Sequence, residues 1–239
     1  MVNGVSASIH CFASPSAIYR YRPLATAKSL KLELEALREG YVYCSSYGDL
    51  NDPMEGRHRL SALFKQSPNK EEVLRLIGQY GVTAFSETHT SETMWAYYAN
   101  QFKGICLKYS VRKLLAGLPS GAVLSKMNYN ELPPMFLRNR QASSLKAKMA
   151  LSYKTIRWAH EREWRLINDC VGKAHYEDTS AVSDIYFGAR VNDAVRAAVL
   201  NAANDLNIKC YDMKVNSYSL DFIRTEAFRP KLKRIRLDK

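Results

Sequence analysis

The sequence predicts a single α+β domain over residues 17–228. Strand-like stretches mix with helical stretches in no strict β-α-β-α order, which is typical of the α+β class. No repeat, low-complexity linker or shift in composition divides the chain. Its 239 residues, 46% hydrophobic and 24% charged, are enough to bury a core without disulfides or a metal. A loose leader over residues 1–16 and a basic tail over residues 229–239 are expected outside this domain.

The elements follow from periodicity and turn signals. Alternating apolar residues bounded by turn formers predict strands. These strands are expected over residues 17–23, 41–45, 82–86, 104–109, 123–129, 163–168, 184–187, 209–214 and 220–227. Apolar residues at helical spacing behind a capping residue predict helices. Ser29 is expected to cap a helix that Gly40 ends, and further helices are expected over residues 69–80, 91–98, 135–157 and 191–206.

The charge of the chain is unusual. Its 35 Lys and Arg residues against 23 Asp and Glu residues give a net charge of +12. Such an excess suits a polyanionic partner such as nucleic acid, and a solvated basic surface explains it equally well. Basic residues gather on the expected 135–157 helix, where the candidates for contacts with nucleic acid are Lys146, Lys148, Lys154 and Arg157.

Targeting signals and cysteine usage indicate a cytoplasmic protein. The chain has no run of about 20 apolar residues and no secretory signal, so neither a membrane span nor a membrane partner is expected. The five cysteines are scattered and form no CxxC pair, which argues against a disulfide framework and a zinc site. Cys44 and Cys106 lie in apolar strand-like runs and are expected to be core thiols.

Several well-known sites are excluded because their motifs are absent. The chain has no GxGxxG after a strand, no GxxxxGK[ST] and no GxSxG. These absences argue against the standard dinucleotide-binding, P-loop and nucleophile-elbow sites. The five histidines show no metal-ligand spacing, so no metal is expected.

Two stretches near the N-terminus carry candidate ligand-binding residues. In Tyr19–Arg22, alternation places the two arginines on one face and the two tyrosines on the other. An arginine on a sheet face can hold a phosphate through two hydrogen bonds, although a solvated strand face is the simpler interpretation. Ser45 and Ser46 follow where a strand gives way to a loop that Asn51-Asp52-Pro53 turns. This loop also has a purely structural explanation.

A third stretch, residues 158–166, contains two glutamates separated by one residue. If a strand begins at Glu163, then Glu161, Glu163 and Arg165 share one face. A glutamate in that position can accept a proton or stabilise a developing cation. The alternative is a helix in which Glu161 and Arg165 form an ordinary i, i+4 ion pair.

Together these stretches resemble a bacterial family of domains of unknown function, family 2971, whose chains open with Tyr-[Arg/Lys]-Tyr. The resemblance covers about residues 18–190. It rests on segments in the same order: Tyr19–Tyr21, Leu50–Glu55, Phe85–Glu87, Met94–Ala99, Gly104–Leu107, Trp158–Arg165 and Ile185–Gly188. The family has no settled activity, so this resemblance alone implies no function.

The order of the segments also resembles, more loosely, the ADP-ribosyltransferase superfamily. This resemblance implies a split, twisted, mainly antiparallel sheet flanked by helices, with NAD bound as substrate in a central cleft. In the arginine-serine-glutamate branch, a first-strand arginine holds the NAD phosphates and a second-strand serine orders the site. A late glutamate stabilises the oxocarbenium-like transition state. By position these residues are Arg20, Ser45 or Ser46, and Glu163.

Further roles follow from the same resemblance. Glu161 would orient the acceptor, Tyr97 or Tyr98 would stack on nicotinamide, and Tyr21 belongs to the same NAD site. The implied activity is cleavage of the nicotinamide–ribose bond and transfer of ADP-ribose to an acceptor. The basic surplus favours nucleic acid over protein as that acceptor. Bacterial transferases of this kind include toxins and anti-phage effectors, which implies a neutralising antitoxin protein as a further partner.

Two other functions remain open at the level of sequence. The first is a nucleic-acid-binding module without catalysis, in which Trp95, Tyr97 and Trp158 stack on bases and the basic helix follows phosphates. The second is a metal-dependent nuclease, because hard cations such as Mg²⁺ bind carboxylates. Its ligands would be Asp52, Glu55, Glu161 and Glu163.

Overall fold

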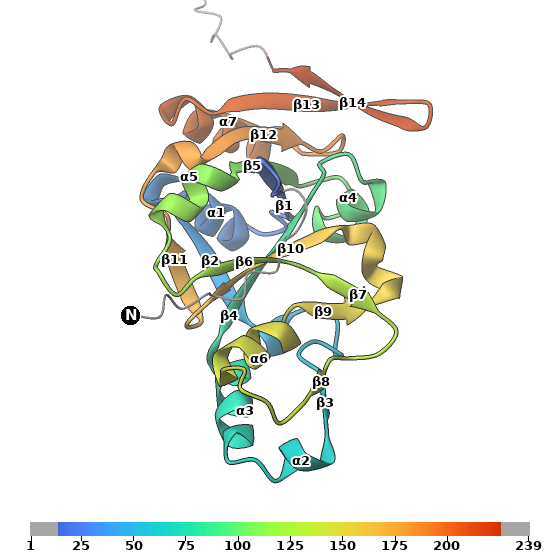
Figure 1. The fold of residues 1–239 in the computed structure, drawn as a ribbon. Coiled ribbons are helices and arrows are strands. Elements are labelled where there is room, and N and C mark those ends of the chain that lie inside the picture. The colour runs from blue at the N-terminus through green and yellow to red at the C-terminus, as the bar shows by residue number, and fades with distance from the viewer. Residues whose placement is uncertain (1–13, 226–239) are drawn as a thin grey trace, which may run out of the picture.

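Strand β5 (Ile105–Ser110) lies in the middle of a mixed sheet because it is largely apolar on both of its faces. The computed structural model describes residues 14–225. Within this range, hydrogen-bonded strands follow the order β11-β2-β4-β1-β5-β12-β13-β14, and β10 and β6 extend from β4 (Figure 1). The pairs of this sheet are antiparallel except for β12–β13. The prediction of one α+β domain with a mainly antiparallel sheet is confirmed.

The other strands of the sheet are β1 (Ala17–Arg22), β2 (Tyr41–Ser46), β4 (Gly81–Ser86), β6 (Val123–Lys126), β10 (Glu163–Asn168), β11 (Gly172–His175), β12 (Val182–Phe187), β13 (Lys209–Asn216) and β14 (Ser219–Arg224). Two short parallel pairs lie outside it: β3 (Arg59–Leu60) with β8 (Met135–Phe136), and β7 (Asn128–Asn130) with β9 (Tyr153–Thr155). The helices are α1 (Ala27–Glu39), α2 (Ala62–Lys65), α3 (Asn69–Gln79), α4 (Glu92–Tyr98), α5 (Val111–Gly117), α6 (Ser143–Ala150) and α7 (Asp193–Asp205). Short 3₁₀ helices are η1 (Tyr47–Asp49), η2 (Ile156–Glu161) and η3 (Thr179–Ala181).

The sheet is split beside β4. Along one side, β4 pairs with β10 over its whole length. Along the other side it pairs with β2 only at its start, where Ser46 lies opposite Gly81, and with β1 only at its end, where Tyr19 lies opposite Ser86. Strands β1 and β2 therefore diverge from β4 and from each other, and the main-chain ladder is interrupted between them.

One face of the sheet is covered by α1 and α7, which contribute Leu37 and Val199 to the main core cluster. Helix α1 begins at a capping box: Thr26 is the N-cap, and Ser29, predicted as the cap, is the reciprocal partner at the third helical position. Gly40 ends the helix in the left-handed conformation, with φ of 67°, which favours glycine. The predicted end of α1 is thus confirmed, and the predicted cap was three residues too late.

A second cluster lies at the end of the molecule where α2, α3 and α6 gather, opposite the β13–β14 hairpin (Figure 1). Helices α3 and α6 pack together there around Val73, Ile77 and Ala147. The segment after β2 packs on this cluster through Tyr47 and Leu50. The cluster thereby fixes the position of residues 47–55.

The predicted helix over residues 135–157 is wrong. Residues 135–136 form β8, α6 covers only Ser143–Ala150, and residues 153–155 form β9. The Lys-rich and Arg-rich run has good helix propensity, but strand pairing of β9 with β7 and of β8 with β3 overrides it. The predicted 123–129 strand is likewise divided into β6 and β7.

Cys44 and Cys106 are buried core thiols, as predicted, and Cys210 is buried as well. Among the described residues, no helix is long and apolar enough to cross a membrane. The predicted tail over residues 229–239 lies outside the described range, as do Cys11 and most of the predicted leader.

Candidate functional site

The two glutamates of the Glu-x-Glu motif come together because the chain turns sharply between them. Glu161 ends η2 and Glu163 begins β10. Arg162 between them adopts the left-handed conformation, with φ of 48°, which is uncommon for a residue with a Cβ. The simple alternation assumed from the sequence therefore does not apply, yet both carboxylates reach the same lysine.

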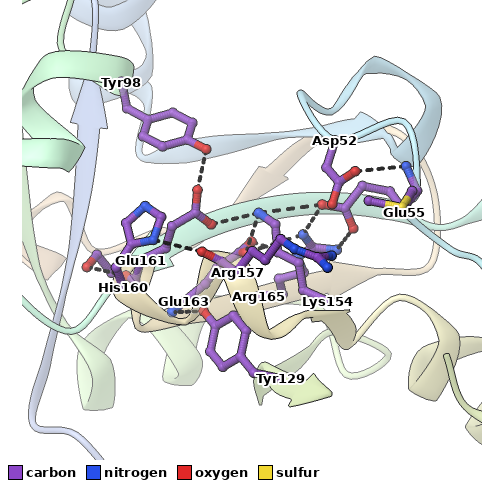
Figure 2. A network of polar contacts seen from close by, with 12 residues as sticks. Asp52, Glu55, Tyr98, Tyr129, Lys154, Arg157, His160, Glu161, Glu163 and Arg165 are labelled. Atoms are coloured by element: carbon purple, nitrogen blue, oxygen red, sulfur yellow. Dashed lines mark hydrogen bonds and ion pairs between the residues drawn. The ribbon is translucent and has the colours of Figure 1, made fainter. Parts of the chain in front are cut away.

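Lys154 and Arg165 join three buried carboxylates into one cluster (Figure 2). The Lys154 ammonium lies 2.6 Å from Glu161, 3.3 Å from Glu163 and 3.7 Å from Glu55. The Arg165 guanidinium donates to both carboxylate oxygens of Glu55, at 2.7 and 2.6 Å, and through Nε to Glu163 at 2.7 Å. The strand expected to begin at Glu163 is present, so the alternative, a helix with an i, i+4 Glu161–Arg165 pair, is not formed.

The cations keep Glu163 ionised despite its burial. Burial raises the pKa of Glu163, but Arg165 and then Lys154 outweigh this effect and hold the pKa below its usual range. For Lys154, burial lowers the pKa, and Glu163 and Glu161 more than compensate, so the pKa lies above its ordinary value. A salt-bridged lysine with a raised pKa is not a nucleophile at neutral pH. Its role here is to hold carboxylates.

Two tyrosines fix the outer parts of the cluster (Figure 2). The Tyr98 hydroxyl, on α4, donates to Oε1 of Glu161, and the Glu163 N–H donates to the Tyr129 hydroxyl at 2.8 Å. Burial, and then the hydrogen bond to Glu161, raises the pKa of Tyr98 far above its usual value, so its hydroxyl stays protonated. Both glutamates are thus held in one orientation by polar contacts. Such preorganisation is what electrostatic catalysis requires.

A cavity of about 210 Å³ opens at the split of the sheet, beside this cluster. Its floor includes Ala84 and Ser86 of β4, and Ala84 is a small exposed residue opposite Arg165 in the register. Of the eight residues predicted for an NAD site, counting both members of the pairs Ser45/Ser46 and Tyr97/Tyr98, six line this cavity: Arg20, Tyr21, Ser45, Tyr98, Glu161 and Glu163. Ser46 is not among the lining residues, and its hydroxyl instead accepts from the Gly48 N–H.

Both arginines of the first strand reach the cavity wall, with different partners. Arg22 forms an ion pair with the buried carboxylate of Glu33. Arg20 donates a long hydrogen bond, 3.5 Å, to the Tyr43 carbonyl and lies beside the Tyr109 hydroxyl, but among the described residues it forms no ion pair. Burial, and then the neighbouring Arg22, lowers the pKa of Arg20. Arg20 is therefore the better candidate for binding an added anion.

The residues proposed for nucleic-acid contacts do not form one exposed face. Lys146 is only 2% exposed and donates to Asn139 and to the Gln141 carbonyl. Lys154 is buried in the carboxylate cluster, and Lys148 donates to the Gly121 carbonyl. Arg157 is exposed on η2. The prediction that the three lysines follow a phosphate backbone is wrong for Lys146 and Lys154, because their ammonium groups are already partnered inside the protein.

The aromatic residues of the binding-module hypothesis are also divided. Trp95 is fully buried and donates its indole N–H to the His89 carbonyl, so it is not available for stacking on a base. Tyr97 is exposed, whereas Tyr98 lines the cavity. Trp158 packs against the Lys154 ammonium, 4.7 Å from the ring centre.

Sequence reasoning did not foresee the role of Glu55, Lys154 and Arg165 as one ion-pair network. The network joins residues 110 positions apart, and no spacing in the sequence reveals such a contact. Two local features of the sequence are consistent with this network. Arg165 stands between Trp164 and Leu166 in a buried strand, and a buried charge requires a partner. Glu55 follows a turn that Asp52 fixes by accepting the Met54 N–H.

The described residues contain no group of three His, Cys, Asp or Glu side chains placed to hold a metal ion. The nuclease hypothesis also conflicts with the pairing of Glu55, Glu161 and Glu163, whose carboxylates bind Lys154 and Arg165. A cation site built from these glutamates would have to displace both side chains.

Part of the ion-pair cluster lies in a segment that matches a known protein family. Residues 94–166 match the family model described as "Protein of unknown function (DUF2971)". The resemblance to family 2971 is confirmed. The segment that matches DUF2971 supplies Tyr98, Lys154, Glu161, Glu163 and Arg165, while Arg20, Ser45 and Glu55 lie before it. Searches of curated proteins and of solved structures found no match.

Proposed function

We propose that this protein binds NAD in the cavity at the split of the sheet, cleaves the nicotinamide–ribose bond and transfers ADP-ribose to an acceptor. One observation carries the proposal: residues from β1, β2, α4, η2 and β10, selected beforehand by the ADP-ribosyltransferase resemblance, line a single cavity. These segments are separated by up to about 140 positions in the chain, so their convergence is a property of the fold. The split sheet would then correspond to the ADP-ribosyltransferase fold.

The charge of the cluster suits the chemistry. Breaking the nicotinamide–ribose bond builds positive charge on the ribose, and a fixed carboxylate a few ångströms away lowers that barrier. Three carboxylates, Glu55, Glu161 and Glu163, face two cations, Lys154 and Arg165, so the formal charge of the cluster is −1. Because its pKa is depressed, Glu163 retains its charge across the physiological pH range. Glu163 is the residue that we assign to the developing cation.

The other lining residues have complementary roles. Arg20, a desolvated cation that forms no ion pair among the described residues, would hold the pyrophosphate. Tyr98 would present its ring to the nicotinamide while its hydroxyl orients Glu161. Glu161 would position the acceptor, since Lys154 and Tyr98 hold both of its oxygens. Ser45 lies where β2 meets β4 and would order the site from the opposite wall.

The test is nicotinamide release from NAD by purified protein, with wild type, Glu163→Gln and the exposed control Glu92→Gln. The Glu163 variant keeps its size, and Arg165 and Lys154 retain Glu55 and Glu161 as partners, so folding should survive. We expect turnover to fall about 10²-fold or more, which corresponds to roughly 3 kcal/mol, whereas the control stays at the wild-type rate. Full activity of Glu163→Gln would refute the assignment, as would no release by the wild type with and without DNA, RNA or a protein extract.

A further inference from the structure

A second cavity, of about 260 Å³, lies on the far side of the ion-pair cluster. The β7–β9 pair forms the partition between the two cavities. Its Tyr129 and Lys154, which are direct partners in the register, point to the cluster (Figure 2). Since side chains alternate along a strand, Asn130, Tyr153 and Thr155 face the other way. All three line the second cavity, and Lys154 lines both.

The lining of this cavity combines apolar residues with charges of both signs, Arg57 and Lys154 against Asp52 and Glu131. Its walls include Met54, Leu132 and Pro133 together with the aromatic ring of Tyr153 and the amide of Asn130. Arg57 stands at its mouth as an exposed cation, and Arg59 follows two residues later, donating to the Pro133 carbonyl. The acidic lining residues are the exposed Glu131 and the buried Asp52, and Asp52 is occupied by the Met54 N–H.

We infer that the second cavity receives an unpaired base of a single-stranded nucleic acid, the acceptor of the reaction; this rests on the proposed function. Sites for single strands combine an aromatic platform for the base with cations for the backbone. Tyr153 provides the platform and Asn130 can hydrogen-bond a base edge, while Arg57 of the lining and the exposed Arg59 outside it neutralise flanking phosphates. A base within a duplex is stacked and has to leave the stack before it can enter a pocket. The net charge of +12 adds a general attraction for a polyanion.

The cavity also lies in the right place for an acceptor. Residues 51–55 and Lys154 separate it from the proposed NAD site, and Lys154 bonds directly to Glu161. A strand anchored by one base here would pass its neighbouring nucleotide towards Glu161, the residue assigned to orient the acceptor. The base bound in the second cavity therefore determines which nucleotide reaches Glu161, and it takes no part in breaking the nicotinamide–ribose bond.

The experiment is fluorescence anisotropy of labelled single-stranded DNA and RNA oligonucleotides and of matched duplexes, without NAD. The test variant is Arg57→Gln/Arg59→Gln, and the matched control is Lys65→Gln/Lys103→Gln, which removes the same charge from other exposed positions. We expect single strands to bind more tightly than duplexes. We also expect about tenfold weaker binding in the test variant, with a salt slope that falls by about 2, and a smaller loss in the control.

Tyr153→Ala tests the pocket itself. Loss of a stacking platform should weaken single-strand binding about tenfold or more, and Tyr153→Phe should restore it because the ring is kept. Equal binding by test and control variants, equal affinity for duplexes, or displacement by poly-glutamate as readily as by single strands would overturn the inference. Failure here is distinct from failure of the proposed function: nicotinamide release without acceptor should be unchanged in Arg57→Gln/Arg59→Gln.

Discussion

Arg165 organises the candidate site at the scale of single residues. It is almost fully buried, and it binds Glu55, Glu163 and the Leu151 carbonyl at once. A buried charge pair adds little net stability when it is complete, but removing one partner leaves the other as an uncompensated charge in a poor solvent. The site should therefore depend on Arg165 both for stability and for the orientation of Glu163.

Arg165→Met should destabilise the protein by about 3–5 kcal/mol, because two buried carboxylates lose their partner. The double variant Glu55→Gln/Arg165→Met should lose less than the sum of the two single variants, since each single change strands a charge that the double change removes. Denaturant unfolding of the three variants measures this coupling. Strict additivity would contradict the network.

The two arginines of β1 should respond differently to the same change. Arg20→Gln should weaken NAD binding about 10- to 100-fold with little loss of stability, because Arg20 forms no ion pair in the described part of the chain. Arg22→Gln should instead lower stability, since it strands the buried Glu33. Isothermal titration with NAD and thermal unfolding of both variants give the comparison. The reverse pattern would assign the phosphate contact to Arg22.

His89 should make folding sensitive to mild acid. Burial lowers its pKa from about 6.5 to about 4, and its ring stacks on Tyr19 and Tyr186. Between these pH values the unfolded chain binds a proton that the folded chain does not, so stability falls as the pH drops. After discounting for partial exposure, lowering the pH from 7.5 to 5 should cost about 1 kcal/mol through this residue, or about 2–4 °C in Tm. His89→Phe keeps the stack and should remove this part of the pH dependence, whereas His175→Gln should not.

At the scale of elements, the split beside β4 creates the proposed binding site. The divergence of β1 and β2 leaves the middle of one edge of β4 without a paired strand, and Ala84 lies exposed in the cavity there. A larger side chain at this position would fill the cavity and leave the strand pairing intact. Because Ala84 is the cross-strand partner of Arg165, the added ring would lie beside the ion-pair cluster as well as in the cavity.

Ala84→Phe should abolish NAD binding and nicotinamide release with at most a small change in stability. Ala197→Phe, on the exposed side of α7, is the matched control and should bind NAD like wild type. Titration calorimetry and thermal unfolding of both variants decide the point. Unaltered NAD binding by a folded Ala84→Phe protein would place the NAD site elsewhere.

The sequence predicted most elements but not the middle of the chain. Strands such as β4, β5 and β10 were found because their apolar runs and flanking turns are local signals. The expected long helix failed because Tyr153–Thr155 is paired with β7, a contact that no local pattern records. The same pairing places Lys154 in the carboxylate cluster and not on the surface of a basic helix. The wrong secondary structure at residues 153–155 therefore led to a wrong role for Lys154, as a contact for nucleic acid.

On the scale of the whole molecule, the fold class was predictable and the composition of the site was predictable in part. The α+β class follows from the order of the elements, and the carboxylates and Arg20 were selected by a motif and a resemblance. Lys154 was not assigned as a partner of the carboxylates, and Arg165 was paired only with Glu161 in the helical alternative, because pairs such as Arg165–Glu55 depend on the three-dimensional register of β10 and the loop before β3. Charge neutralisation in a core is a global requirement, and a single sequence does not show which residues satisfy it.

The central claim is that the cavity beside Glu163 is an NAD site. Its most direct test is a crystal structure of Glu163→Gln with NAD bound, because the slow variant should retain the intact substrate. We expect NAD density in the cavity, with the nicotinamide ribose beside position 163 and the pyrophosphate beside Arg20. An empty cavity at saturating NAD, or NAD bound at another surface, would contradict it.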